Sequence, residues 1–222
     1  MSDGGGPADT LLLITRHGQT DANREQRVQG QGDTPLNAEG LEQARRLAAF
    51  LADEFPGPPS AARSARRRVD RILSSDLLRA RQTAEILRAE LAVPVTFHPE
   101  LRARRMGEYE NRTHAELSAA DPESFRRLKH DPAFVPPGGG ESTDQLRARA
   151  LPFVRGAAAL YPGQCVVILS HHKVCQLLIA ELAGTGRMDP IPNARPATIL
   201  FEGGEFRVVG DEEAFVSSHG TA

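Results

Sequence analysis

Three consecutive residues near the start of the chain, Arg16, His17 and Gly18, have the properties that phosphate chemistry requires. An arginine guanidinium offers a planar, charged fork to phosphate oxygens. A histidine ring nitrogen is nucleophilic and titrates near neutral pH, and a glycine lets the backbone approach a ligand closely. The alternative is an arginine and a histidine that merely follow a core strand, and the triplet alone does not decide between the two interpretations.

The residues around this triplet predict where it lies. Residues 11–15 are an apolar run without alternation, which predicts a strand buried on both faces of a parallel sheet. The triplet then lies at the carboxyl end of that strand, where open α/β sheets bind ligands. Residues 21–37 are almost wholly polar and predict a long functional loop around the same site. In this loop the amides of Asn23 and Gln29 can donate to a phosphate.

Two later segments repeat the arrangement of a strand followed by polar residues. Residues 69–73 predict a strand that ends in a Ser-Ser-Asp turn, and Arg79 lies about one turn into the helix that follows. Residues 165–169 predict a buried strand that ends in Ser-His-His. Alone, such an arginine is more often a surface residue, and such a histidine is often a satisfied core residue.

Composition restricts the class of protein. The chain has 222 residues, a formal net charge of −2 and 40% hydrophobic residues, as expected of a soluble globular protein without a nucleic-acid or membrane partner. Cys165 and Cys175 form neither a disulfide framework nor a metal-binding spacing, which favours a reducing cytoplasm. Residues 1–9 predict a flexible tail rather than a signal peptide, and residues 55–68 predict a Pro/Ala/Arg linker.

The remaining patterns predict ordinary elements. Helical spacing of apolar residues indicates helices at 38–51, with Asn37 as N-cap, at 77–87 and at 174–182. A further helix is expected at 143–160, with Ser142 or Thr143 as its N-cap. Residues 197–209 predict a hairpin around Gly203 and Gly204.

Several motifs together resemble the histidine phosphatase superfamily, in its phosphoglycerate-mutase-like branch. They are RHGQT at 16–20, Asn23, QG at 29–30, DTPLN at 33–37, SSDLLRARQTA at 74–84 and PGGGES at 137–142. The resemblance implies that His17 is phosphorylated and that Arg16 and Arg79 hold the phosphate. It also implies that Asn23 binds phosphate and that His171 is the second catalytic histidine. Gln29 and Gly30 are expected to contribute to substrate binding from the same loop.

The segment LRARRMGEYEN at 101–111 departs from the family pattern. Ala103 stands where family phosphatases carry the glutamate that protonates the leaving oxygen. Glu110 matches a second, mainly structural glutamate, so Glu108 is the candidate for a displaced acid, with Glu100 in reserve. General acid catalysis contributes about 10²–10⁴-fold and matters most for strongly basic leaving groups.

Two further features bear on substrate binding. His172 stands where the family usually has glycine, and it either caps the following helix or narrows the pocket. Arg102, with Arg104 and Arg105, either draws anionic substrates to the mouth of the site or belongs to a solvated loop. Both His172 and Arg102 are counted among the candidate substrate-binding residues.

The expected fold is a three-layer α/β/α sandwich with a mostly parallel sheet and an antiparallel edge strand. It forms one domain over residues 10–215, between tails at 1–9 and 216–222. The expected function is a cytoplasmic phosphomonoester hydrolase that needs neither a metal nor an organic cofactor. Its substrate is a small phosphorylated metabolite or a phosphoprotein, with activated aryl or acyl phosphates favoured by Ala103. The alternatives are a phosphoglycerate-mutase-type phosphotransferase and a catalytically weak phosphate-binding scaffold. The sequence does not distinguish a monomer from a dimer.

Overall fold

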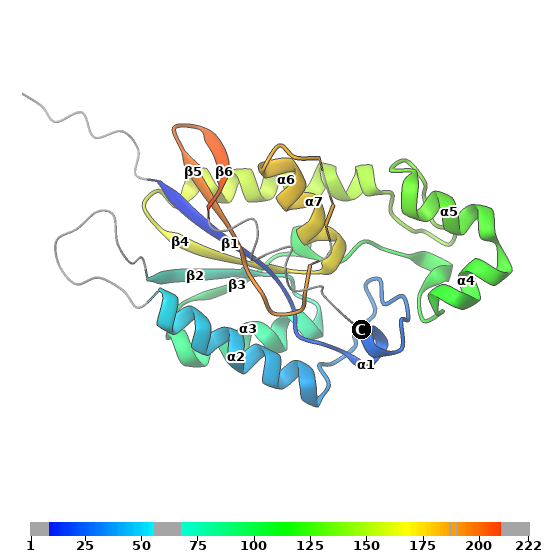
Figure 1. The fold of residues 1–222 in the computed structure, drawn as a ribbon, viewed down its shortest axis with the longest axis horizontal. Coiled ribbons are helices and arrows are strands. Elements are labelled where there is room, and N and C mark those ends of the chain that lie inside the picture. The colour runs from blue at the N-terminus through cyan, green and yellow to red at the C-terminus, as the bar shows by residue number, and fades with distance from the viewer. Residues whose placement is uncertain (1–8, 56–67, 187, 190, 210–222) are drawn as a thin grey trace, which may run out of the picture.

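The computed structural model describes residues 9–55, 68–186, 188–189 and 191–209. In this part of the chain six strands form one mixed sheet in the order β3-β2-β4-β1-β5-β6 (Figure 1). The strands are β1 (Thr10–Arg16), β2 (Val69–Ser74), β3 (Val95–Phe97), β4 (Cys165–Ser170), β5 (Ala197–Glu202) and β6 (Glu205–Val208). The strands from β3 to β1 are parallel, whereas β5 runs antiparallel to β1 and β6 antiparallel to β5.

Helices cover both faces of the sheet, α2 and α3 on one and α6 and α7 on the other (Figure 1). The helices are α1 (Asp21–Arg24), α2 (Ala38–Glu54), α3 (Leu78–Leu91), α4 (His114–Ala120), α5 (Pro122–His130), α6 (Thr143–Leu160) and α7 (His172–Leu182). Along β1, Leu12 and Ile14 pack in the core with α6 and α7, while Leu11 and Leu13 pack in the core with α2 and α3. Burial of each such side chain stabilises the fold by about 1.5–3 kcal/mol, which anchors β1 from both sides.

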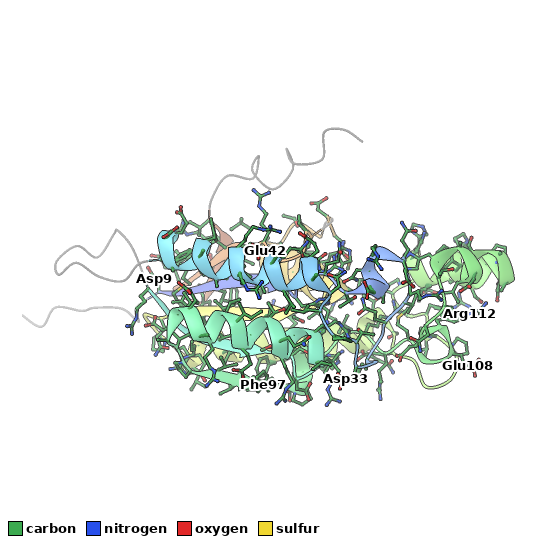
Figure 2. All side chains as sticks on the ribbon, turned by 90° about the horizontal axis from the view of Figure 1, so that it is seen from below. Asp9, Asp33, Glu42, Phe97, Glu108 and Arg112 are labelled. Carbon is green, nitrogen blue, oxygen red and sulfur yellow. The ribbon has the colours of Figure 1, made fainter. Side chains whose placement is uncertain are left out.

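The helices that flank the sheet begin where the sequence places their caps. The Asn37 side chain accepts from the backbone N–H of Gly40 at the start of α2. Ser142 caps α6 and forms a reciprocal capping box with Gln145. The start of α3 differs, because no side chain of its own N-cap residue bonds there. Asp33 accepts from the backbone N–H of Leu78 at 2.8 Å instead, so the polar loop is fastened to the start of α3 (Figure 2).

Helices α4 and α5 extend beyond the carboxyl ends of the parallel strands (Figure 1). A small apolar cluster packs the region of α4 and α5 against the loop at 21–37. The cluster is formed by Val28, Tyr109, Leu117 and Phe134. An isolated β-bridge joins Arg27 to Thr113 beside it. In the described ranges no helix is both long and apolar enough to cross a membrane.

The predicted fold class is confirmed, including the antiparallel edge. The segment at 21–37 is not wholly a loop, because residues 21–24 form the single turn α1, which is too short to show a helical period. Helix α7 begins at His172, two residues before the predicted start, with His171 as its N-cap residue. The predicted tails at 1–9 and 216–222 and the linker at 55–68 lie outside the described residues, apart from residues 9, 55 and 68.

Candidate active site

The register of the parallel strands brings the two predicted catalytic histidines side by side. Arg16 at the end of β1 lies opposite Ser170 at the end of β4. The next residues along the two strands, His17 and His171, follow directly, and the backbone N–H of His17 donates to the Ser170 carbonyl at 3.1 Å. Their ring centroids are 5.1 Å apart, with the ring planes tilted by 58°. Both side chains are buried, at 2% and 4% exposure.

The hydrogen bonds of His17 define which of its nitrogens can react. Nδ1 lies 2.6 Å from the carbonyl oxygen of Gly18, which only accepts, so the ring proton is assigned to Nδ1. Nε2 therefore carries the lone pair, and Nε of Arg79 donates to it at 3.2 Å. A neutral imidazole in this tautomer presents a nucleophilic Nε2 beside a guanidinium.

Arg79 is held by the backbone of the polar loop rather than by an acid. It is 1% exposed, and its Nη1 and Nη2 donate to the carbonyl oxygens of Gly32 at 2.8 Å and Gly30 at 2.9 Å. Arg16 is partly buried, and its Nη1 reaches the Ile191 carbonyl at 3.5 Å. Among the described residues neither guanidinium has a carboxylate within ion-pair distance, so one buried and one partly buried positive charge lie at the site without an internal counter-ion.

Burial and positive charge lower the proton affinity of the groups in this site. The pKa of His17 lies well below its usual value, first because of burial and then because of repulsion by Arg79 and Arg16. The pKa of His171 is lowered in the same way. Burial also lowers the pKa of Arg16 and of Arg79 to about 10, so both guanidiniums stay charged at neutral pH. The site thus combines neutral imidazoles with charged guanidiniums.

Three buried side-chain nitrogens in the described part of the chain have no hydrogen-bond partner. They are Nε of Arg16, Nδ1 of His171 and Nδ1 of His172. All three residues stand at the adjacent ends of β1 and β4. Because leaving a buried polar group unpaired costs about 1–3 kcal/mol, the cluster is suited to a ligand that supplies acceptor oxygens.

The candidate binding residues of the polar loop differ in how they face the site. Oδ1 of Asn23 accepts from the backbone N–H of Thr20 at 3.1 Å, which leaves its Nδ2 to donate to a ligand. Oε1 of Gln29 accepts from the hydroxyls of Thr20 and Thr34 at 3.0 and 2.6 Å, so it braces the loop. Gly30 presents its carbonyl to Arg79 and thereby orients that guanidinium rather than offering a donor to an anion.

The absence of a side chain at Gly18 lets the chain lie close to the backbone of Gly40 in α2. A Cβ at this position would overlap the carbonyl oxygen of Gly40 in α2, and a Cβ at Gly40 would in turn overlap the carbonyl oxygen of Gln19. The backbone N–H of Gly18 donates to Oγ1 of Thr83 in α3 at 3.2 Å. This paired contact sets the position of the chain just after His17.

The backbone of Ala103 is held by side chains from two other segments. Its carbonyl accepts from Nε2 of Gln31 and from Nη2 of Arg149, both at 3.0 Å. Arg102, which was predicted to bind substrate, donates from Nε and Nη2 to both carboxylate oxygens of Asp76, at 2.7 and 2.6 Å. Its charge is therefore largely neutralised within the protein.

The glutamates near Ala103 take different places. Oε1 of Glu110 accepts from the backbone N–H groups of Gln31 and Met106, so it ties two loops together. Glu108 is exposed. It lines an open pocket of about 490 Å³ that Gly32 and Arg105 also line. Figure 2 shows Glu108 toward the end of the molecule formed by α4 and α5, well separated from Asp33. The backbone carbonyl of Glu100 accepts a hydrogen bond from Nη1 of Arg149 at 2.6 Å.

His172 is the first residue of α7 and does not cap it by a side-chain hydrogen bond. Its pKa is lowered to about 4, mainly by burial and then by the charge of Arg16, while a hydrogen bond with the Ile191 backbone opposes the shift. Its imidazole is therefore neutral at pH 7 and lies near Arg16.

The segment at 191–194 supports the site, although no pattern in the sequence predicts this role. Nδ2 of Asn193 donates to the His17 carbonyl at 2.7 Å, and the backbone N–H of Ala194 donates to the Arg16 carbonyl at 3.0 Å. These bonds fix the backbone of both residues from the side opposite β4. The segment has no period and no known motif, so only its position in space shows its role.

Known proteins are similar to this chain in both sequence and fold. The chain matches the histidine phosphatase superfamily (branch 1) over residues 12–58 and 59–212. It is 36% identical to a glucosyl-3-phosphoglycerate phosphatase from Mycolicibacterium vanbaalenii, over 78% of this chain and 74% of that protein. It is 31% identical to the adenosylcobalamin/alpha-ribazole phosphatase of Escherichia coli, over 78% of this chain and 79% of that protein.

Solved structures agree with these matches. The structure of a mycobacterial glucosyl-3-phosphoglycerate phosphatase superposes with a TM-score of 0.77 at 28% identity, covering 90% of this chain and 97% of that one. The matched family residues include the strand ends that carry His17 and His171. The chain belongs to branch 1 of the histidine phosphatase superfamily.

Proposed function

We propose that this protein hydrolyses phosphomonoesters through a phosphohistidine intermediate on His17. Its family makes it a histidine phosphatase, a phosphoric monoester hydrolase. The observation that carries the mechanism is the pair of bonds on His17, with Nδ1 tied to the Gly18 carbonyl and Nε2 beside Arg79. This pair leaves a lone pair on Nε2 at the point where a charged guanidinium can hold a phosphoryl group.

The reaction has two displacements at phosphorus. Nε2 of His17 attacks phosphorus, the Nε2–P bond forms, and the bond to the leaving oxygen breaks with its electron pair on that oxygen. The Gly18 carbonyl then stabilises the positive charge that develops on the ring through the Nδ1–H bond. A water molecule next attacks phosphorus, the N–P bond breaks, and inorganic phosphate leaves.

We assign the binding of the phosphoryl oxygens to four side chains of the site. Arg16 and Arg79 supply two positive charges, His171 supplies a ring nitrogen, and Asn23 supplies an amide N–H. Donors that are already in position need little reorganisation in the transition state, and each typically contributes about 10²–10³ in rate. In this scheme the positive charge that offsets the phosphate comes from protein side chains.

The leaving group is where this chain departs from its family. With Ala103 in the position of the acid, the leaving oxygen receives no proton there, so weakly basic leaving groups are favoured. These are aryl or acyl phosphates, including such groups on a phosphoprotein. The pocket lined by Gly32, Arg105 and Glu108 begins at the loop that holds Arg79, and we assign it to the leaving group. We place Glu108 on the wall of that pocket rather than in proton transfer.

The substrate is a small phosphorylated metabolite or a phosphoprotein. The names of the relatives point to small phosphorylated metabolites, and a phosphoprotein would need the open side of the pocket. Cys165 and Cys175 are both buried and are not joined by a disulfide bond, which supports the reducing cytoplasm as the location.

The test compares two esters with leaving groups of different basicity, p-nitrophenyl phosphate and 3-phosphoglycerate. We expect the aryl ester to turn over faster, and His17→Ala to abolish the turnover of both. Acid-labile phosphate on the quenched wild-type protein, absent from His17→Ala, would mark the intermediate. The exposed His130 at the end of α5 offers the control His130→Ala, which should keep wild-type rates.

Two results would overturn the proposal. Turnover that survives His17→Ala would place the nucleophile elsewhere. Phosphate binding without hydrolysis of either ester would indicate the scaffold instead of an enzyme.

A further inference from the structure

Ser75 lies in the motif at 74–84, and its side chain contacts the second histidine of the site. It follows β2, as His171 follows β4, and its backbone N–H donates to the Leu169 carbonyl at 2.9 Å. The side chain is fully buried, and its Oγ lies 2.8 Å from Nε2 of His171. The three adjacent strand ends thus place Ser75, His171 and His17 in one row.

The hydrogen bonds of Ser75 give the contact a direction. A serine hydroxyl has one proton to donate and lone pairs that accept. The backbone N–H of Leu77 donates to Oγ at 3.3 Å and so occupies a lone pair. Within the described residues, Nε2 of His171 is the one other partner of this hydroxyl. Unless the proton goes to Nε2, a fully buried donor is left unpaired, at a cost of about 1–3 kcal/mol.

A hydroxyl that donates to Nε2 requires a lone pair on that nitrogen, so the proton of the neutral His171 ring must be on Nδ1. That Nδ1 is buried and has no partner among the described residues. It belongs to a ring whose centroid is 5.1 Å from that of His17, beside the buried charge of Arg79. Phosphoryl oxygens only accept hydrogen bonds, so an N–H here is the form that the substrate requires.

We propose that Ser75 is a positioning residue that holds His171 in the Nδ1–H tautomer, so that Nδ1–H donates to a phosphoryl oxygen. This inference rests on the proposed function for its catalytic consequence. The two histidines then share one tautomer and use it in opposite ways. His17 turns its lone pair at Nε2 to phosphorus, and His171 turns its proton at Nδ1 to an oxygen.

The hydroxyl also opposes protonation of His171. A cationic ring would carry protons on both nitrogens, and the Nε2–H would face a hydroxyl whose own proton has no other acceptor in the described residues. Without Ser75 the ring is free to place its proton on Nε2, which turns the Nδ1 lone pair toward a phosphoryl oxygen. The interaction then changes from attraction to repulsion.

Nitrogen-15 spectra of the histidine-labelled protein measure the tautomer directly, with His171→Asn to assign the signals. In the wild-type protein we expect His171 to show a protonated Nδ1 and an unprotonated Nε2 at pH 7. Saturating inorganic phosphate should shift the Nδ1 signal and leave this pattern intact. A protonated Nε2 in the wild-type protein, or an Nδ1 signal that ignores phosphate, would overturn the inference.

The serine pair at 74–75 offers a matched comparison. Ser74 is also fully buried, but its Oγ donates to the Ser75 carbonyl at 2.9 Å and has no contact with His171. We expect Ser75→Ala to mix the two tautomers of His171 and to lower kcat for p-nitrophenyl phosphate about 10-fold, the worth of one such bond. Ser74→Ala should keep the wild-type tautomer and stay within about twofold of the wild-type kcat.

Equal spectra and equal rates for the two variants would overturn the role of Ser75. If Ser75→Ala does not fold, the wild-type spectra with and without phosphate still decide the tautomer. A wild-type protein that fails to hydrolyse p-nitrophenyl phosphate yet shows the Nδ1–H pattern would refute the proposed function alone.

Discussion

Nε of Arg79 donates to Nε2 of His17 across 3.2 Å, so the nucleophilic lone pair is covered by the same guanidinium that would hold the phosphate. Burial is the main reason that the pKa of His17 lies well below its usual value, and the charge of Arg79 lowers it further, so the imidazole is neutral. An incoming phosphoryl group has to exchange this bond for bonds from Arg79 to its own oxygens. In the proposed mechanism Arg79 therefore holds the lone pair of the nucleophile in place before it binds the substrate.

The first prediction concerns Arg79→Met. We expect kcat/KM for p-nitrophenyl phosphate to fall by about 10²–10³-fold, because one buried donor to the transition state is lost. The pKa of His17 should move up toward its usual value. The acid limb of the pH–rate profile should then shift to higher pH. Arg81→Met on the same helix is the control, since Arg81 is exposed and lies over the ring of Phe97, and it should stay near wild type. Equal losses in both variants would point to damage of α3 rather than to the site.

The second prediction concerns the missing acid. We propose that Ala103 stands in the position of the family's proton donor, so Ala103→Glu should speed 3-phosphoglycerate hydrolysis by about 10²-fold if the new carboxyl group protonates the leaving oxygen. Hydrolysis of p-nitrophenyl phosphate should change little, because its leaving group needs no proton. The ratio of the two kcat values is the measurement. A ratio that does not move would mean that another group already supplies the proton.

Glu108→Gln tests the displaced-acid alternative. Because Glu108 is exposed and lies toward α4 and α5 (Figure 2), we expect turnover of both esters to stay within about threefold of wild type. A loss confined to 3-phosphoglycerate and larger than about 10-fold would identify Glu108 as the acid after all. Glu123→Gln is a suitable control, since Glu123 is exposed on α5 and is paired with Arg126.

The strand ends could be predicted because their physical signal is local. An unbroken apolar run such as residues 11–15 suits only a strand buried on both faces, and the polar residues after it then fall at the carboxyl edge of the sheet. The caps at Asn37 and Ser142 are equally local, since each side chain bonds a backbone N–H three residues ahead.

The parts that could not be predicted depend on contacts between segments distant in sequence. Asp33 accepts a hydrogen bond from the first residue of α3, 45 residues later in the sequence. Asn193 donates to the His17 carbonyl, 176 residues earlier. Arg102 has the charge that a substrate-binding residue needs, and only the fold shows Asp76 placed to neutralise it. Residue type and local spacing carry no record of such pairings.

The fourth prediction follows from His172, whose pKa in the folded protein is lowered to about 4 against about 6.5 in an unfolded chain. Between these two values the unfolded chain binds the extra proton, so the free energy of unfolding decreases as pH falls from 6.5 toward 4. His172→Gln removes this contribution. We expect the variant to lose less stability than wild type between pH 7 and pH 5, by up to about 2 kcal/mol. Urea unfolding at both pH values measures the free energy of unfolding of each protein. Equal losses of stability in the wild type and the variant would show that His172 is not held neutral.

The last prediction concerns the close backbone contact after the nucleophile. A methyl group at Gly18 would meet the carbonyl oxygen of Gly40, and neither backbone can move without displacing His17 or the start of α2. Gly18→Ala should therefore cost at least the 1–3 kcal/mol typical of overpacking and lower kcat together with Tm.

Gly156→Ala is the matched control, because Gly156 lies inside α6 with no atom within 4 Å of the added methyl group. Alanine is favoured over glycine in a helix, so this variant should gain about 0.5–1 kcal/mol and keep its activity. Opposite signs for the same chemical change would show that Gly18 is required by the approach of α2 rather than by chain flexibility. A Gly18→Ala protein as stable and as active as wild type would mean that this contact can relax without moving His17.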